Sequence, residues 1–365
     1  MMEKLAGEQF VATLVELGMT RFTGVPCSTF KGLFHAPELK YLPAPHEGLA
    51  YAWAVGGHLA GRPTGVISQN SGVGNLINAL TSLALPCDVP VFSLVSLRGY
   101  PTPESDEAQH VVMGGATEGI LRETGAMVQV MDAACYADQM DELLHGTQPK
   151  PRFLLVPKGM LVWEAASPVR DDERARRPMS AMDVARVVAE VRPPEVATFA
   201  TTGFSSRYLA SFGDLPTNFY MQGSMGHVPA LAAGFAAASG QPVVILDGDG
   251  ALAMHPGAMS LVGRAGLHVV HVVVDNGTYA STGSQALPMV PQWHQLAQAY
   301  QYDHCADVSN AVDLAEALRA AVEGAGATLI VARTNDDVCN DVPRASTLIR
   351  MNDMFTRLQT EVARR

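Results

Sequence analysis

Two short motifs contain the residues whose types and spacing point most clearly to chemistry. They are Gly248-Asp249-Gly250 and Asp275-Asn276-Gly277, and Asp275 comes 25 residues after Gly250. Each motif follows a short β-branched apolar run, residues 243–246 and residues 269–274. Such runs are typical of buried parallel strands, here with a crossover helix between them. Because ligands bind at the carboxyl ends of strands in open α/β sheets, we expect Asp249 and Asn276 to meet at one sheet edge.

Asp249 and Asn276 carry hard oxygen ligands that suit Mg²⁺, an ion that commonly bridges to phosphate groups. Gly248 and Gly250 allow a diphosphate to approach the backbone, and the N-terminus of the following helix favours the anion. An isolated Gly-Asp-Gly is common in ordinary turns, but the flanking strands and Asn276 favour a metal–diphosphate site. The paired motifs resemble the cofactor motif of thiamine diphosphate enzymes. This resemblance implies that the main-chain carbonyl of Thr278 is a third metal ligand.

The length, charge and cysteine pattern of the chain limit the classes of protein to which it can belong. A chain of 365 residues has room for two domains with full cores. A net charge of −11 argues against nucleic acid as a partner, and it means that an anionic substrate needs a local cluster of cations. Five cysteines without CxxC spacing argue against a zinc site and fit reduced thiols in the cytoplasm. The chain begins without a signal-peptide pattern, and no apolar run approaches the roughly 20 residues that cross a bilayer, so we expect a cytoplasmic protein without membrane partners.

Helical and strand patterns alternate along the chain in two halves. Strands are predicted at residues 21–25, 41–44, 64–68, 89–95 and 152–156, and again at 195–200, 217–220, 243–246, 269–274 and 328–332. The pattern predicts an α/β protein with two doubly wound parallel-sheet domains, residues 1–165 and residues 180–365. A Pro- and charge-rich linker, residues 166–179, lies between them, and Ser180 with Asp183 predicts a capping box that opens a new helix.

Glu47 is the candidate acid of the first half, where a strand gives way to a helix predicted at residues 49–60. That helix is rich in Ala and Gly and has few charged neighbours, so burial should raise the pKa of the Glu47 carboxyl. The alternative interpretation is an ordinary first-turn acid stabilised by the helix dipole. The resemblance to thiamine diphosphate enzymes favours a role for Glu47 as the activating acid beside the pyrimidine ring of the coenzyme. It also implies a pyrimidine-binding and a diphosphate-binding domain that meet across a subunit interface, and hence a dimer or higher oligomer.

Further segments resemble the phosphonopyruvate decarboxylase family over nearly the whole chain. They are residues 24–28, 69–75, 106–110, 201–203 with Arg207, 223–227 and 281–285. The chain also lacks a middle domain between the two coenzyme domains, a layout that this family shares with sulfopyruvate decarboxylases. In the latter the two halves are often separate chains, so a fused chain favours the phosphonopyruvate enzymes. Three features depart from the family pattern: Asp275 and His46 stand where Asn is more usual, and the region after Asn335 matches poorly.

The resemblance implies loss of CO₂ from an anionic 2-oxo acid, 3-phosphonopyruvate, to give phosphonoacetaldehyde in phosphonate biosynthesis, with thiamine diphosphate and Mg²⁺ as cofactors. Met225 matches the apolar wedge that bends the coenzyme. The other residues expected beside the coenzyme are Glu47, Asn70, Thr202, Gly203, Gly248, Asp249, Gly250 and Asn276. Candidates for substrate binding are the cations Lys31, Arg98 and Arg207 and the hydroxyl groups of Ser28 and Thr282. His110 and His227 are the candidates for proton transfer, and His255, His268 and His271 are expected to be structural.

Three other functions stay open at this point. Sulfopyruvate or another anionic 2-oxo acid could be the substrate, or the same chemistry could end in carboligation. A non-catalytic thiamine-binding protein is disfavoured, because a purely structural pocket has no need of Glu47 together with Asp249 and Asn276. A dehydrogenase is disfavoured, because no GxGxxG motif opens a first strand–helix turn with an acidic residue about 20 positions later.

Overall fold

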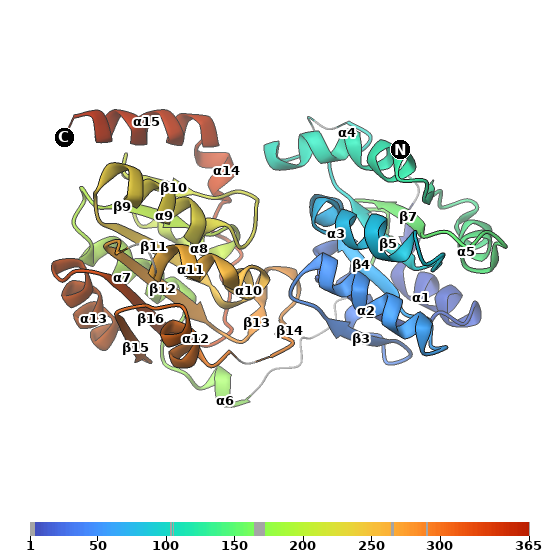
Figure 1. Cartoon of the computed structure of the whole chain (residues 1–365), viewed down its shortest axis with the longest axis horizontal. Helices are drawn as coiled ribbons and strands as arrows, with labels where there is room; N and C mark the ends of the chain where they lie inside the picture. Colours follow the sequence, from blue (N-terminus) through green and yellow to red (C-terminus); the bar gives the residue numbers. More distant parts are fainter. Residues whose placement is uncertain are drawn as a thin grey trace. The chain divides into compact units, whose positions relative to one another are not determined.

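The chain divides into two compact units, Met1–Pro168 with Thr282–Pro288, and Val169–Ser281 with Met289–Arg365 (Figure 1). The computed structural model describes residues 4–102, 104, 106–163, 172–263, 266–289 and 291–364. Residues 166–171 of the predicted linker therefore lie outside the described part of the chain. Among the helices that are described, none combines the length and the apolar composition that a bilayer crossing requires.

The first unit is built on a six-stranded sheet. The strands of this unit, inside and outside that sheet, are β1 Leu5–Ala6, β2 Arg21–Gly24, β3 Lys40–Pro43, β4 Gly65–Gln69, β5 Phe92–Leu97, β6 Met127–Val130, β7 Arg152–Pro157, β8 Leu161–Val162 and β14 Gln285–Ala286. Its helices are α1 Gly7–Glu16, α2 Glu47–Leu59, α3 Val73–Ala79, α4 Ala108–Glu123 and α5 Tyr136–His145, with the short turns η1 Ser28–Phe30, η3 Asn70–Gly72 and η4 Leu80–Ala84. The sheet order is β3-β2-β4-β5-β7-β6, and all of its strand pairs are parallel.

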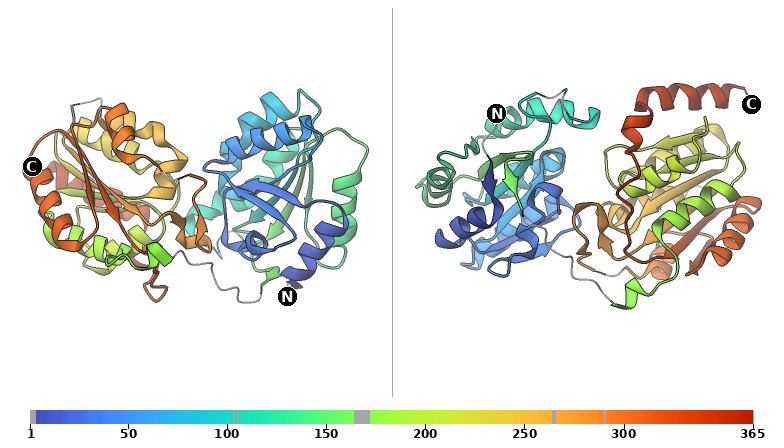
Figure 2. Two further views of the ribbon diagram at one scale, coloured as in Figure 1. Left: turned by 90° about the horizontal axis from the view of Figure 1, so that it is seen from below. Right: turned by 180° about the vertical axis from the view of Figure 1, so that it is seen from behind.

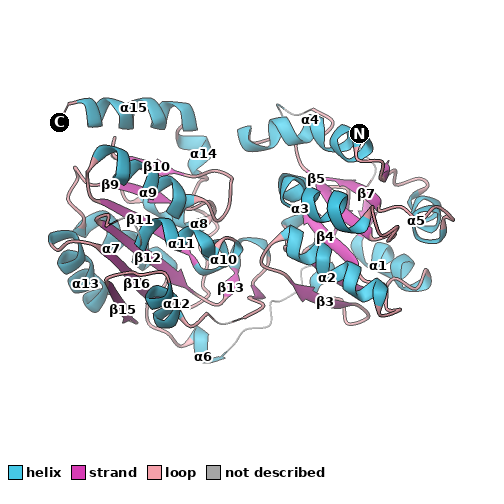
Figure 3. Cartoon of the chain, viewed as in Figure 1, coloured by secondary structure: helices cyan, strands magenta, loops and turns pink. Residues whose placement is uncertain are grey.

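The second unit is also built on a six-stranded sheet (Figure 3). The strands of this unit, inside and outside that sheet, are β9 Ala197–Ala200, β10 Asn218–Tyr220, β11 Val243–Gly248, β12 Val269–Asp275, β13 Thr278–Tyr279, β15 His304–Val308 and β16 Ala327–Arg333. Its helices are α6 Asp172–Ala175, α7 Ala181–Val191, α8 Phe204–Ser211, α9 Val228–Ser239, α10 Asp249–Met254, α11 Met259–Gly263, α12 Trp293–Ala299, α13 Ala311–Glu323, α14 Ala345–Leu348 and α15 Met351–Ala363. The sheet order is β10-β9-β11-β12-β16-β15, again with parallel pairs.

The two sheets have the same topology. When the strands of each sheet are numbered in chain order, both sheets read 2-1-3-4-6-5. The winding direction reverses between β2 and β4 in the first unit and between β9 and β11 in the second. A crevice at the carboxyl ends of the strands is expected at such a reversal, and this is where doubly wound folds bind ligands.

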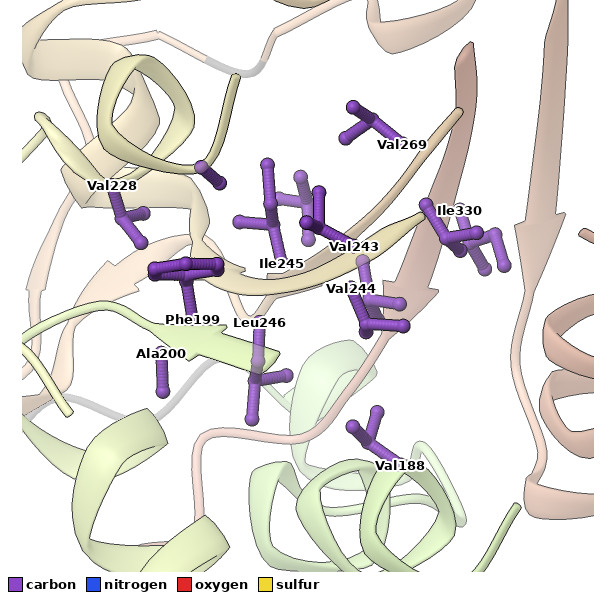
Figure 4. Close-up of a cluster of buried hydrophobic side chains, with 14 of the residues drawn as sticks. Val188, Phe199, Ala200, Val228, Val243, Val244, Ile245, Leu246, Val269 and Ile330 are labelled. Atoms are coloured by element: carbon purple, nitrogen blue, oxygen red, sulfur yellow. The ribbon is translucent and has the colours of Figure 1, made fainter. Parts of the chain in front are cut away.

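Helices cover both faces of each sheet because the central strands are apolar on both faces (Figure 2). In the first unit Val66 packs in the core beside α2 and α3, whereas its neighbour Ile67 packs in the core beside α1 and α5. In the second unit Val243 and Ile245 of β11 point to one face and Val244 and Leu246 to the other (Figure 4). This two-sided burial produces the continuous apolar runs from which the strands were predicted.

The α/β fold with two parallel sheets is confirmed, and every predicted strand is found in one of them. The capping box is also confirmed, since the Ser180 hydroxyl accepts from Asp183 N and the Asp183 carboxylate accepts from Ser180 N. The prediction missed β6 and β15, which are edge strands with partly exposed residues and no continuous apolar run. The crossover between β11 and β12 is helical as expected, but Pro256 divides it into two short helices, α10 and α11.

Candidate functional site

The candidate coenzyme residues of the second unit lie at the carboxyl edge of its sheet. Strands β11 and β12 are hydrogen-bonded neighbours, and their last pair is Gly248 with Val274. Asp249 and Asn276 therefore follow directly from adjacent strand ends, as the sequence predicted. Thr202 and Gly203 follow β9, on the other side of the reversal in strand order. Gly203 has a φ of 93°, a conformation that favours glycine.

Asp249 is a buried carboxylate held by main-chain donors. Its side chain is 3% exposed, and its two oxygens accept hydrogen bonds from Gly250 N and Gly277 N, each at 2.6 Å. Burial, and after it the charge of the neighbouring Asp275, hold the pKa of Asp249 well above its usual range. Within the described residues no lysine or arginine forms an ion pair with it. A divalent cation bound here would supply the missing positive charge.

Asp275 has its own partners, which explains how a carboxylate is accommodated where the family usually has Asn. It accepts a hydrogen bond from Trp293 Nε1 at 2.7 Å and forms an ion pair with Arg333. Arg333 also pairs with Asp307 at 2.7 Å. The Asp275 carboxylate is thus compensated by a cation, and Asp249 and Asn276 are left for a ligand.

The donor set fits Mg²⁺. Asn276 Oδ1 accepts from Thr278 N at 2.9 Å, which fixes the carboxamide beside the Thr278 main chain. Asp249 and Asn276 are both buried, and each Asp249 oxygen keeps a lone pair for a metal. Asn276 Oδ1 also accepts from Thr278 Oγ1 at 3.3 Å, so a metal at Asn276 would take the place of this longer hydrogen bond. The described residues contain no group of three or more His, Cys, Asp or Glu side chains that could hold a metal. A site made of one carboxylate, one carboxamide and one main-chain carbonyl would not form such a group.

Met225 and His227 lie in the turn that follows β10. His227 is exposed, and its Nδ1 lies 3.1 Å from Ser224 O and 3.2 Å from Met225 O. Because both partners are carbonyls, Nδ1 is the donor, and Nε2 of the neutral ring is free to accept a proton. The ring of His255 lies 4.4 Å from that of His227, a pairing that the sequence did not indicate.

Glu47 is the first residue of α2 and is 5% exposed. Burial raises the pKa of its carboxyl, and a 2.8 Å hydrogen bond from Asn75 Nδ2 to Oε2 opposes this rise. His46 caps the helix, because its Nδ1 accepts from Gly48 N at 3.0 Å. An Asn side chain at an N-cap accepts from the backbone in the same way, so His46 supplies the same kind of helix cap as the Asn that is more usual before the acid.

Asn70 and Arg98 follow the neighbouring strands β4 and β5. The Asn70 side chain is fully buried and bonds to both main-chain groups of Arg98, at 2.9 Å and 3.2 Å. The Arg98 guanidinium makes two hydrogen bonds to Asp106, which also accepts from Lys158 Nζ at 3.1 Å. Burial raises the pKa of Asp106, but these donors outweigh it and the net pKa is well below the usual range.

Arg98 is thus already paired with a carboxylate, and Lys158 is a half-exposed cation that the sequence analysis missed. Lys158 follows β7, whose last residue pairs with the last residue of β5, so the strand register places it beside Arg98. The spacing between these two cations in the sequence contains no signal of their proximity.

His110 is buried in the first turn of α4 and has Glu107 3.9 Å from its Nε2. Burial, and after it the charge of Arg98, lower the pKa of His110 to about 4, so the ring is neutral at pH 7. Its Nδ1 is buried and has no hydrogen-bond partner among the described residues.

The remaining candidates are less closely connected to these groups. Ser28 and Lys31 are exposed near the carboxyl end of β2, and no described hydrogen bond or ion pair joins them to Glu47 or Arg98. Thr282 donates to Gln285 Oε1 at 3.0 Å. Arg207 lies on α8 with its guanidinium 5.1 Å from the ring centre of Phe204.

Comparison with known proteins identifies relatives over most of the chain. Residues 201–332 match the family described as thiamine pyrophosphate enzyme, C-terminal TPP binding domain. The chain is 34% identical over 355 residues to phosphonopyruvate decarboxylase of Streptomyces viridochromogenes, covering 89% of this chain and 87% of the relative. It is 32% identical to the enzyme of the same name from Streptomyces hygroscopicus, covering 89% and 86%. It is 29% identical to sulfopyruvate decarboxylase of Methanosarcina acetivorans, covering 76% and 77%. The chain therefore belongs to the phosphonopyruvate decarboxylase family of thiamine diphosphate enzymes, as the motifs predicted.

Proposed function

We propose that this protein decarboxylates 3-phosphonopyruvate to phosphonoacetaldehyde and CO₂ with thiamine diphosphate and Mg²⁺. The observation that carries the proposal is that a chain of this family keeps both Glu47 and Asp249 as buried, hydrogen-bonded carboxyl groups. Bound thiamine diphosphate supplies an electron sink for the electron pair that is released when CO₂ leaves the substrate.

The second unit would hold the diphosphate through the metal. Asp249, Asn276 and the Thr278 carbonyl are assigned as Mg²⁺ ligands, because a buried carboxylate without a cation partner favours a divalent ion. Gly203, Gly248 and Gly250 would let the backbone approach the phosphates, and Thr202 would donate a hydrogen bond. Met225 is assigned as the apolar support of the coenzyme.

Glu47 would share a proton with the pyrimidine ring. Burial raises its pKa, which favours the protonated form relative to an exposed glutamate. His110 and His227 are assigned to the proton that replaces CO₂ on the substrate carbon. Each neutral ring has a nitrogen without a hydrogen-bond partner among the described residues, and it would have to take up a proton there before it donates one to the carbon.

The phosphonate and carboxylate of the substrate need cations in a chain with a net charge of −11. Arg98 and Lys31 are assigned to this role, with hydrogen bonds from Ser28 and Thr282 and with Asn70 as the side chain that holds the Arg98 main chain. Because Arg98 is nearly buried and paired with Asp106, the half-exposed Lys158 beside it is more accessible than Arg98.

We also propose self-association into a dimer or a higher oligomer, with the active sites at the subunit interface. The helix that begins at Glu47 exposes Leu49, Trp53 and Leu59, which are 60%, 60% and 79% exposed. Large apolar side chains on one helix are typical of a surface that another protein covers. A second copy of this chain is the partner that the domain arrangement of thiamine diphosphate enzymes requires.

The test is CO₂ release from phosphonopyruvate, sulfopyruvate and pyruvate, measured side by side with thiamine diphosphate and Mg²⁺. Mass spectrometry should identify phosphonoacetaldehyde, and Glu47→Gln should lower the rate by about 10²–10⁴-fold, the range for a lost proton-transfer group. Turnover of sulfopyruvate alone would replace the proposed substrate. Binding of the coenzyme without turnover of any of the three acids would favour a non-catalytic protein instead.

A further inference from the structure

The segment that follows β4 fixes the Glu47 carboxylate from two sides. Asn75 Nδ2 donates a 2.8 Å hydrogen bond to Glu47 Oε2. Gly72 lies against the other oxygen so closely that a Cβ on residue 72 would be 2.0 Å from Oε1. Both contacts come from residues 72–75, at the start of α3, which packs along α2. The orientation of the carboxylate is therefore set by this segment.

The hydrogen bond distinguishes the two oxygens of Glu47 chemically. The Asn75 Nδ2 group is a donor, so the Oε2 lone pair that faces it must accept and cannot carry a proton there. When the carboxyl group is protonated, the proton is consequently directed to Oε1. Gly72 presents no side chain on that side, so Oε1 packs against bare backbone and meets no side-chain donor from residue 72.

We propose that Asn75 is a positioning residue that holds Glu47 and directs its proton exchange to Oε1. This inference rests on the proposed function of Glu47 in activating the coenzyme. Asn75 does not touch the reacting atoms itself. Its effect is exerted through the orientation of the acid and through the choice of oxygen.

The electrostatic surroundings of Glu47 support this role, because few other groups act on its charge. The elements packed against α2 are α3, η4, β2 and β4. Their one titratable residue is Arg21, at the amino end of β2 and far along the strand from Glu47. Helix α2 itself carries Tyr51 and His58, and the preceding His46 caps it through a hydrogen bond from Gly48 N. Burial raises the Glu47 pKa, and Asn75 is the side chain that opposes the rise. Without Asn75 the acid would stay neutral over a wider pH range.

The experiment compares three variants of the full-length protein. Asn75→Leu removes the donor at similar size, and Asn75→Asp replaces it with a carboxyl that repels the Glu47 carboxylate. Asn78→Leu is the matched control, because Asn78 lies on the same helix and is exposed. The first readout is hydrogen–deuterium exchange of the C2 proton of bound thiamine diphosphate without substrate. The second is the infrared carboxyl band of Glu47 in the coenzyme-free protein as a function of pH, assigned by its loss in Glu47→Gln.

We expect Asn75→Leu to slow the exchange at least about tenfold, the factor for loss of one hydrogen bond to a charged group. Asn75→Asp should be slower still, and both variants should keep the protonated carboxyl band to higher pH. Coenzyme affinity and melting temperature should stay close to those of Asn78→Leu. An exchange rate in Asn75→Leu equal to that of the wild type would overturn the inference. If the Leu variant does not fold, an unchanged pH dependence of the Glu47 carboxyl band in Asn75→Asp would overturn it. Because neither readout uses substrate, Asn75-dependent exchange in a protein that leaves phosphonopyruvate intact would overturn only the proposed function.

Discussion

Gly72→Ala is the perturbation that most directly tests how the activating acid is held. A Cβ on residue 72 would lie 2.0 Å from Glu47 Oε1 and 2.5 Å from Cδ. Residue 72 has φ −86° and ψ −5°, close to the values at the third position of a type I turn, which most residues including alanine adopt. The atoms it would meet belong to the end of a side chain, so we expect the Glu47 carboxylate to move and the backbone to stay.

The size of the effect follows from this displacement. Non-bonded heavy atoms prefer separations of about 3.5 Å or more, so the carboxylate must retreat by more than about 1 Å. A misplacement of about 1 Å in a catalytic arrangement can cost about 10²-fold in rate. The retreat also strains the hydrogen bond from Asn75, and loss of a hydrogen bond to a charged group costs about 1.5–3 kcal/mol. We therefore expect kcat to fall by about 10²-fold, while overpacking lowers the free energy of unfolding by about 1–3 kcal/mol.

The assay is steady-state decarboxylation, with thermal melting and coenzyme binding measured on the same preparations. Gly74→Ala is the matched control, because a Cβ at residue 74 meets nothing within 4 Å and alanine favours the helix. It should keep full activity and equal or higher stability. Full activity in Gly72→Ala would mean that the position of the Glu47 carboxylate does not limit the reaction, and equal loss in both variants would point to a general effect on α3.

Three further outcomes are expected. Calorimetry should show that Asp249→Ala no longer binds thiamine diphosphate in a Mg²⁺-dependent way. The wild type should likewise lose the coenzyme in excess chelator. Retention of the coenzyme in either case would exclude Asp249 as a metal ligand. His110 has a pKa lowered from 6.5 to about 4, so the unfolded chain binds the proton first, and stability should fall as the pH falls through that window. Denaturant unfolding should show a smaller loss between pH 7 and pH 5 in His110→Gln than in the wild type, and identical losses would contradict the burial argument. Trp53→Glu should shift the oligomer towards monomer in light scattering, and a fully active wild-type monomer would argue against self-association through α2.

The central strands and the family could be predicted from the chain because their signals are local. The apolar runs before Asp249 and Asn276 are continuous, since β11 and β12 are buried on both faces. The capping box at Ser180 depends on residues three positions apart, and it too was predicted correctly. Strands β6 and β15 were missed, because most of their residues are partly exposed or exposed and they contain no continuous apolar run.

Contacts between distant segments were decided by the tertiary structure alone. Asn75 approaches Glu47 across 28 positions of the chain, and Arg333 reaches Asp275 across 58. Lys158 lies beside Arg98 because β5 and β7 are neighbours in the sheet order. The types of residue needed for the chemistry can thus be identified from local sequence, because each candidate directly follows a strand that can be predicted. Packing between strands and helices decides which oxygen of Glu47 is held, that Asp275 is paired with a cation, and that His110 is buried away from water. No local pattern in the sequence encodes that packing.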